Sequence, residues 1–230
     1  MRKPIIAIDG PAGAGKSTVA RIVAERLGYI YIDTGAMYRA VALAVLRSGI
    51  PISDHAKITA LAKALDLRFE KVGDEQRLYS NGEDVTEAVR TPEATRLSSP
   101  VSAIRGVRSR LVELQRKMGE QGGVVMEGRD IGTVVFPNAE VKVFLTASAE
   151  ERARRRTEEL RQKGIEADVS RIAADIAERD LRDSSRVHAP LKQAPDAVLI
   201  ETDNMTAEQV ADAIIELHNA RANEDALRNR

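Results

Sequence analysis

The 230-residue chain contains no cysteine, which excludes disulfide bonds, thiolate metal sites and cysteine nucleophiles. Aromatic residues make up only 3% of it, too few for a stacking platform that binds single-stranded nucleic acid. Lys+Arg and Asp+Glu both number 35, so no net charge attracts nucleic acid or an anionic membrane. The apolar run at residues 4–8 is far shorter than a signal peptide or a membrane span, and no later segment does better. We therefore expect a cytoplasmic globular protein with neither nucleic acid nor a membrane as partner.

Hydrophobic periodicity predicts an alternation of strands and helices, which is typical of a parallel sheet. The chain opens with two strand–helix pairs, the first helix ending at Gly28 and the second at Ser48-Gly49. Strands are expected at residues 5–8, 29–33, 124–126, 141–145 and 197–200. Helices are expected after the first two strands and at about 54–65, 104–118, 150–162, 169–182 and from 206 on, where Thr206 and Gln209 form a capping box.

One stretch breaks the alternation and predicts an inserted antiparallel element at about 66–90, because Asn81-Gly82 is a strong two-residue hairpin signal. We expect one α/β domain over residues 1–220, with a doubly wound parallel sheet flanked by helices. Its core covers 1–50, 120–148 and 190–220, the insert-bearing region about 51–119, and a helical lid about 149–189. Residues 221–230 are expected to form a polar tail, with fraying after about Asn219.

The strongest motif is a P-loop of the form G-x-x-x-x-G-K-S between the first strand and the first helix, made of Gly10, Pro11, Ala12, Gly13, Ala14, Gly15, Lys16 and Ser17. Its backbone N–H groups would converge on the β-phosphate of ATP, with Lys16 bridging the β- and γ-oxygens. Ser17 would bind Mg²⁺, and Thr18 would contact the α-phosphate. A glycine-rich turn that binds nothing is the alternative. The chain lacks an Asn-Lys-x-Asp guanine-reading motif, which disfavours a Ras-type GTPase.

Two polar segments follow strands and should lie at the carboxyl edge of the sheet, where α/β proteins bind ligands. In the first, Thr34 and Arg39 could meet a monophosphate, and Asp33 could reach the metal through water. The alternative is that Thr34 caps a helix while Arg39 lies on its solvated face. In the second, Arg129 suits a phosphate, and Asp130 suits a base amino group or a magnesium-bound water. A surface ion pair is the alternative for these two residues.

Arginine-rich helices form the expected lid. Arg179, Asp183 and Arg186 are spaced to share one helix face, and a second cluster comprises Arg152, Arg154, Arg155 and Arg156. The alternative for the second cluster is ordinary surface pairing, Glu151 with Arg155, Arg154 with Glu158, and Arg155 with Glu159. Bringing a monophosphate up to a triphosphate requires several converging cations, and this requirement favours a lid.

These motifs together resemble the bacterial cytidylate kinases, on residues 8–17, 33–39, 128–137 and 178–180. The resemblance implies a P-loop NTPase-type fold, a monophosphate-binding region at about 51–119, ATP and Mg²⁺, and CMP and dCMP as acceptors. We also expect a monomer, because nothing in the sequence suggests an exposed stripe that would bind a partner. It implies that Thr34, Arg39 and Arg129 hold the CMP phosphate, that Ser99, Arg108 and Asp130 read cytosine, and that Arg179, Asp183 and Arg186 contact ribose and phosphates. The implied catalytic cations are Lys16, Arg39, Arg129, Arg154, Arg156 and Arg179.

The chain departs from the usual family pattern at Arg105-Gly106, which makes the placement of Arg108 less secure, and at Asn138. Two alternatives remain open. One is a P-loop kinase for another small acceptor, such as shikimate, gluconate or a different nucleotide. The other is a nucleotide-sensing module that binds ATP without transferring its phosphoryl group.

Overall fold

The computed structural model describes residues 2–73, 75–162, 164 and 166–228, which divide into two compact units. The first unit comprises residues 1–31 and 121–230, and the second comprises residues 32–120. Residues 163 and 165 of the expected lid, and 229 and 230 of the expected tail, lie outside the described residues. The first unit carries a five-stranded sheet, and the second carries a three-stranded one.

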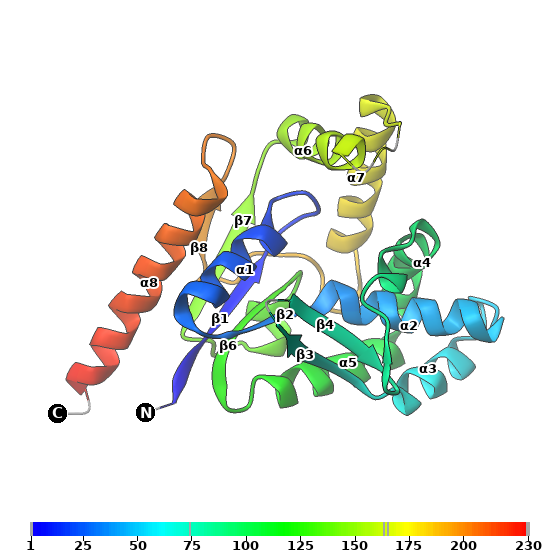
Figure 1. Ribbon diagram of the computed structural model, residues 1–230, viewed down its shortest axis with the longest axis horizontal. Coiled ribbons are helices and arrows are strands. Elements are labelled where there is room, and N and C mark those ends of the chain that lie inside the picture. The colour runs from blue at the N-terminus through cyan, green and yellow to red at the C-terminus, as the bar shows by residue number, and fades with distance from the viewer. Residues whose placement is uncertain (1, 74, 163, 165, 229–230) are drawn as a thin grey trace. The chain divides into compact units, whose positions relative to one another are not determined.

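The first unit contains the parallel sheet that the sequence predicts. Over the described residues this sheet has five strands in the order β2-β6-β1-β7-β8. They are β1 (Lys3–Asp9), β2 (Ile30–Asp33), β6 (Gly122–Gly128), β7 (Val141–Thr146) and β8 (Val198–Glu201). Strand β1 pairs in parallel with β6 and β7, and β7 pairs in parallel with β8 (Figure 1). The segments that follow β1, β6 and β7 therefore leave the same edge of the sheet.

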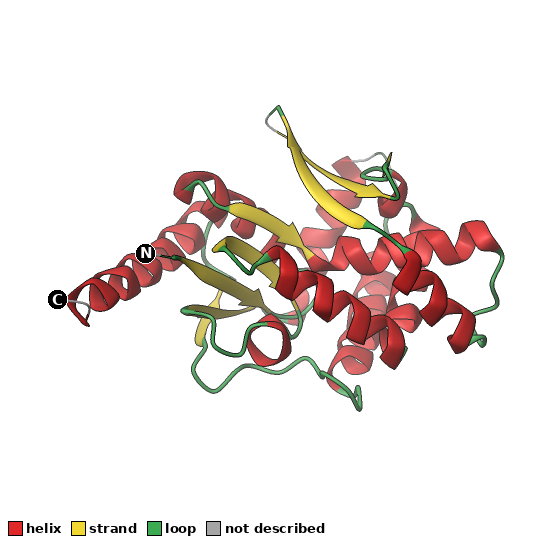
Figure 2. Ribbon diagram, turned by 90° about the horizontal axis from the view of Figure 1, so that it is seen from below, coloured by secondary structure: helices red, strands yellow, loops and turns green. Residues whose placement is uncertain are grey.

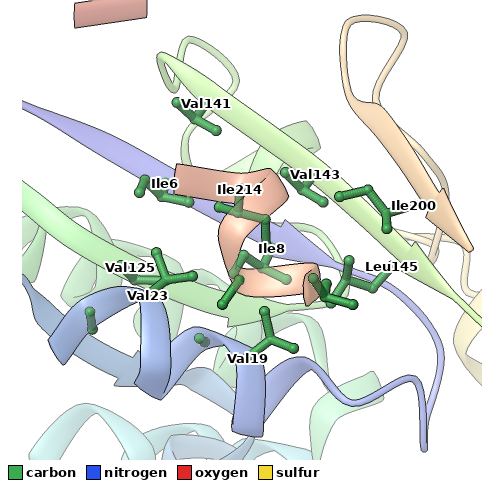
Figure 3. Close-up of a cluster of buried hydrophobic side chains, with 14 of the residues drawn as sticks. Ile6, Ile8, Val19, Val23, Val125, Val141, Val143, Leu145, Ile200 and Ile214 are labelled. Atoms are coloured by element: carbon green, nitrogen blue, oxygen red, sulfur yellow. The ribbon is translucent and has the colours of Figure 1, made fainter. Parts of the chain in front are cut away.

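One face of this sheet is covered by helices α1 (Lys16–Leu27) and α8 (Ala207–Arg228). Figure 3 shows Val19 and Val23 of α1 and Ile214 of α8 directed at strand residues such as Ile8 and Leu145. This core consists of Val, Ile, Leu and Ala, as the scarcity of aromatic residues requires. Burying each of the larger side chains stabilises the fold by about 1.5–3 kcal/mol relative to exposure.

Two charged helices, α6 (Ala149–Gln162) and α7 (Val169–Ser184), lie in the region for which a helical lid is predicted (Figure 1). They pack through a small apolar cluster of Ala153, Ile172 and Ile176. A π-helical turn, η2 (Ile131–Val135), lies between β6 and β7 and was not expected.

Helix α8 continues to Arg228, well past the fraying expected after Asn219. Its predicted capping box is confirmed, because the Thr206 N–H donates to Gln209 Oε1 at 2.8 Å and the Gln209 N–H donates to Thr206 Oγ1 at 3.2 Å. Over the described residues, no helix combines the length and the low polarity needed to cross a membrane.

The second unit combines helices with the predicted antiparallel insert (Figure 2). Its elements are α2 (Thr34–Ser48), α3 (His55–Ala64), β3 (Leu67–Val72), β4 (Glu75–Ser80), β5 (Glu83–Asp84), η1 (Ala88–Arg90), α4 (Pro92–Ala103) and α5 (Arg105–Met118). The hairpin turn is confirmed: Asn81 and Gly82 both have positive φ, 50° and 83°, as a type I′ turn requires. Helix α4 was missed, although Thr91 accepts a capping bond from the Ala94 N–H and Pro92 begins the helix.

The glycine at the unusual Arg105-Gly106 position has a packing reason. A Cβ on Gly106 would lie 2.3 Å from Cγ2 and 2.4 Å from Oγ1 of Thr59, on the facing helix α3. Helices α3 and α5 therefore approach each other too closely for any larger residue at 106 without displacement of Thr59.

Candidate active site

The P-loop joins β1 to α1 and needs glycine where the chain turns most sharply. Gly10 has φ of 148°, and a Cβ there would lie 2.0 Å from the Leu145 carbonyl oxygen at the end of β7. Gly13 has φ of 79°, and a Cβ there would lie 3.0 Å from Cβ of Arg152. The loop therefore sits closely between the end of β7 and the start of α6. This is the strand–loop–helix context that a phosphate-binding P-loop requires.

Lys16 is buried at the start of α1, and its Nζ donates to the Pro11 carbonyl at 2.7 Å. Burial and, next in importance, the positive charge of Arg129 together lower the pKa of Lys16 to about 7, and Glu127 opposes the shift. Arg179 of α7 also contributes to the lowering of this pKa, so its guanidinium lies near enough to Lys16 to interact. The site thus concentrates positive charge that an incoming polyphosphate would compensate.

Asp9, the last residue of β1, had no expected role, although it directly precedes the P-loop. Its carboxylate is buried and accepts from the backbone N–H groups of Ile131 at 2.8 Å and Gly132 at 2.7 Å. Burial raises the pKa of Asp9 to about 6, against the opposing effect of these two hydrogen bonds. The carboxylate fixes the loop that carries Arg129 and Asp130 to the end of β1.

Three expected residues form one buried ion-pair cluster. Arg129 Nε donates to Asp183 Oδ2 at 2.8 Å, and Arg186 donates to Asp183 Oδ1. The Asp183 side chain is 3% exposed, and those of Arg129 and Arg186 are 17% and 12% exposed. Burial alone would raise the pKa of Asp183, but the two arginines hold it below its ordinary value. Arg129 thus pairs with Asp183 across the fold rather than forming an exposed pair with its neighbour Asp130, which is itself buried.

The arginines of α6 divide between two environments. Arg154 pairs with Glu151, and Arg156 pairs with Glu159, both within α6. These are ordinary pairs along one helix, as the alternative reading expected, but their partners differ from the expected ones. Arg155 pairs with Glu151, which is one of the pairs that the alternative predicted. It also donates to the hydroxyl and the carbonyl of Thr202.

Arg152, by contrast, reaches the P-loop. It donates to the Ala12 carbonyl at 3.1 Å and pairs with Asp180 of α7. Neither Arg152 nor Asp180 has a separate role among the predictions made from the sequence.

A cleft of about 420 Å³ lies beside the P-loop, a volume within the range of small-molecule sites. Its lining comes from the P-loop and α1 (Ala14, Gly15, Thr18, Val19), from α6 (Glu151, Arg154, Arg155), and from the segment leading into α8 (residues 202–207 and Val210). The lining combines apolar side chains, such as Val19, Met205 and Val210, with polar ones, such as Thr18 and Asn204.

The second unit carries the expected phosphate-binding segment at the start of α2. Asp33, rather than Thr34, caps this helix: its Oδ1 accepts from the Ala36 N–H at 2.8 Å. Its Oδ2 accepts from Arg39 at 2.9 Å. Thr34 is buried, and the Arg39 side chain is only 20% exposed. The alternative in which Thr34 caps the helix and Arg39 lies on a solvated face is therefore wrong.

Ser99 and Arg108, the other residues expected to read cytosine, lie on the contacting helices α4 and α5. Arg108 is buried, with its guanidinium 5.5 Å from the ring centroid of Tyr38 and Nη1 donating to the Ser102 carbonyl at 3.4 Å. Ser102 Oγ in turn donates to the Ser99 carbonyl at 2.7 Å. The departure at Gly106 thus leaves Arg108 in a defined, buried position.

A magnesium ion bound with ATP fits the donor set of the P-loop. Mg²⁺ usually takes one or two protein ligands together with phosphate oxygens and water. The Ser17 hydroxyl at the start of α1 has no hydrogen-bond partner among the residues described, so its oxygen is available to the ion. Among the described residues no group of three or more His, Asp or Glu side chains could hold a metal alone. Both oxygens of Asp33 are engaged, by the Ala36 N–H and by Arg39.

Comparison with known proteins identifies the family. The family model for cytidylate kinase matches residues 6–220. The chain is 53% identical to a cytidylate kinase of Syntrophotalea carbinolica over 94% of this chain and 92% of that protein, and 55% identical to one of a Geobacter species over 90% and 88%. An uncharacterised protein of Eubacterium ventriosum shares the fold, with a TM-score of 0.53 and 14% identity over 94% of this chain and 99% of that one. The chain belongs to the cytidylate kinase family.

Proposed function

We propose that this chain transfers the γ-phosphoryl group of ATP to CMP and dCMP, giving ADP with CDP or dCDP. The observation that carries the proposal is the family match over residues 6–220, which includes every residue assigned here to a nucleotide. We also propose that the enzyme acts as a monomer in the cytoplasm and has no nucleic-acid partner.

The donor half of the reaction uses the first unit. The backbone N–H groups of residues 13–16 bind the β-phosphate, and Lys16 and Arg179 compensate charge on the γ-phosphoryl group. When bound, Mg²⁺ held by Ser17 would neutralise the phosphate oxygens and help to orient them. The cleft beside the P-loop is the site that we assign to adenine.

The acceptor half needs cations for a phosphate and donors and acceptors for a base. Thr34, Arg39 and Arg129 hold the phosphate in this proposal, with Arg179 and Arg186 nearby on the lid side and Asp183 on the ribose. Arg108 and Ser99 would donate to the ring of cytosine, and Asp130 would accept from its 4-amino group. The acceptor phosphate is largely dianionic near neutral pH because its second pKa is about 6, so the transfer needs no general base.

Arg154 and Arg156 are proposed as lid cations that reach the transferring group. Each would first leave an exposed ion pair, with Glu151 and Glu159 respectively. Exposed pairs of this kind are worth about 0.2–1 kcal/mol, which is a small barrier to such a movement.

A steady-state panel tests the proposal. ADP formation is measured with CMP, dCMP, UMP, AMP, shikimate and gluconate as acceptors, with and without Mg²⁺. We expect CMP and dCMP to give the highest kcat/KM, and Asp130→Ala to narrow the preference for CMP over UMP by about tenfold or more, because a buried acceptor for the amino group is lost. Tight ATP binding without ADP formation from any pyrimidine monophosphate would refute the proposal and favour a nucleotide sensor.

A further inference from the structure

Two charged side chains, from α6 and α7, bind the backbone N–H and the backbone carbonyl of one P-loop residue, Ala12. The backbone N–H of Ala12 donates to Asp180 Oδ1 at 3.3 Å, and the Ala12 carbonyl accepts from Arg152 Nη1 at 3.1 Å. The same Arg152 nitrogen pairs with Asp180 Oδ2. An ion pair between α6 and α7 thus engages both polar atoms contributed by a single loop residue.

This contact is well enclosed and fixed at its base. The Arg152 and Asp180 side chains are 11% and 21% exposed. Arg152 Nε also donates to the Ala147 carbonyl at 3.1 Å, which ties the guanidinium to the end of β7. Gly13 lies directly against Arg152, where a Cβ would meet Arg152 Cβ at 3.0 Å. The P-loop therefore packs closely against the first turn of α6.

The residues around Asp180 on α7 are those assigned to the phosphates. Arg179 precedes it and is close enough to Lys16 to affect its ionisation. Asp183, almost one helical turn further, binds both Arg129 and Arg186. A shift or rotation of α7 would move Arg179 and this cluster together, because a helix transmits displacement along its length as a rigid element.

We propose that Arg152 and Asp180 are positioning residues that lock α6 and α7 onto the P-loop at Ala12 and thereby hold Arg179 against the phosphate chain of ATP. The proposal rests on the proposed kinase function and adds a role for two residues that need not touch a substrate. Their contribution is the geometry of the closed lid, which excludes water from the transferring phosphoryl group.

The test compares Asp180→Asn and Arg152→Lys with Arg182→Ala, a matched control that removes an exposed pair with Glu178 from the same helix α7. Asp180→Asn keeps the shape but removes the charge, and Arg152→Lys keeps the charge but cannot bridge two acceptors in the same plane. We expect kcat to fall by about 10- to 100-fold in both, because small displacements of catalytic groups are that costly. KM values for ATP and CMP should stay within about threefold of the wild type, since the loss falls on the transition state.

Three further readouts distinguish positioning from general destabilisation. The ratio of CMP-independent ATP hydrolysis to CMP phosphorylation should rise in both lock variants and stay unchanged in Arg182→Ala. Amide hydrogen exchange in α7 should accelerate in Asp180→Asn but not in the control, with thermal midpoints matched. A variant carrying both Arg152→Lys and Asp180→Asn should be no slower than the slower of the two single variants, because the pair acts through one contact.

The proposal is overturned if the lock variants turn over at the rate of Arg182→Ala, if the two single effects multiply, or if kcat increases. An increase would mean that the contact holds an inactive arrangement. A wild-type chain that phosphorylates no pyrimidine monophosphate would refute the kinase function instead, and the hydrogen-exchange comparison would still test the lock.

Discussion

Replacing Asp9 by Asn should change how the stability of the chain depends on pH. Asn has the shape of the protonated acid but does not titrate, so the variant isolates the effect of ionising a buried carboxyl group. Because burial raises the pKa of Asp9 from 3.8 to about 6, ionisation in the folded state costs about 3 kcal/mol, at about 1.4 kcal/mol for each pKa unit. The Asp9 carboxylate accepts two hydrogen bonds from the η2 turn. At neutral pH its buried charge nevertheless destabilises the fold.

The sign follows from proton linkage. Between pH 3.8 and about 6 the folded chain binds the Asp9 proton more tightly than the unfolded chain does, so the contribution of Asp9 to stability falls as pH rises through this window. The free energy of unfolding of Asp9→Asn minus that of the wild type should therefore increase by about 2.4 kcal/mol from pH 4 to pH 7. Asn has one side-chain oxygen where Asp has two, so the variant loses a hydrogen bond from the backbone N–H of Ile131 or Gly132. This loss shifts the difference by an amount that does not depend on pH.

Urea unfolding followed by circular dichroism at pH 4, 5, 6 and 7 measures this difference. Asp196→Asn is the control that should stay nearly flat over this range, because the hydrogen bond with Lys142 lowers the pKa of Asp196, so that its stabilising effect is lost only as pH falls below about 4. If the free energy of unfolding of Asp9→Asn minus that of the wild type is as flat with pH as the Asp196 control, or falls as pH rises, the reasoning that Asp9 is a buried carboxylate fixed between β1 and η2 is refuted.

Lys16→Ala and Arg39→Ala should leave circular dichroism spectra unchanged and lower kcat by about 10³-fold, since each removes a cation from the transferring or accepting phosphate; near-normal turnover in either would contradict its role. Asp183→Asn should lower the free energy of unfolding at pH 7 by about 3 kcal/mol, because it leaves Arg129 and its partner guanidinium without a buried counter-charge. Since the folded-state pKa of Asp183 lies below its ordinary value, this deficit should shrink as pH falls below about 4, and urea unfolding that shows a constant deficit would contradict the ion-pair account.

The parts of the fold that could be read from the sequence are those specified by local signals. The P-loop needs glycines at fixed positions, and the Asn81-Gly82 turn needs two residues that tolerate positive φ. The aliphatic runs of β1 and β7 likewise predict buried strands. Helix α4 was missed because Ser98, Ser99 and Pro100 interrupt its apolar pattern, and an internal proline usually marks a helix end.

The long-range contacts of the site could not be predicted in this way. Asp9 lies 122 residues from Ile131 along the chain, and Ala12 lies 168 residues from Asp180, so only the completed sheet brings them together. Four arginines in the first turns of α6 look equivalent in sequence. Which of them meets the P-loop depends on how the helix docks on the end of β7, and docking places Arg152 there.

Three of the arginines assigned to a phosphate are each held by a carboxylate. Asp183 binds Arg129 and Arg186, and Asp33 binds Arg39. Arginine side chains grouped closely enough to bind phosphates would repel one another if they had no counter-charge, and burial would increase that repulsion. Interleaved carboxylates remove this cost, keep the guanidinium groups oriented, and leave a guanidinium with further N–H donors for an arriving phosphate. The balance of 35 basic and 35 acidic residues therefore does not argue against an anion-binding enzyme, because the acids are what allow the cations to be assembled before the substrate is present.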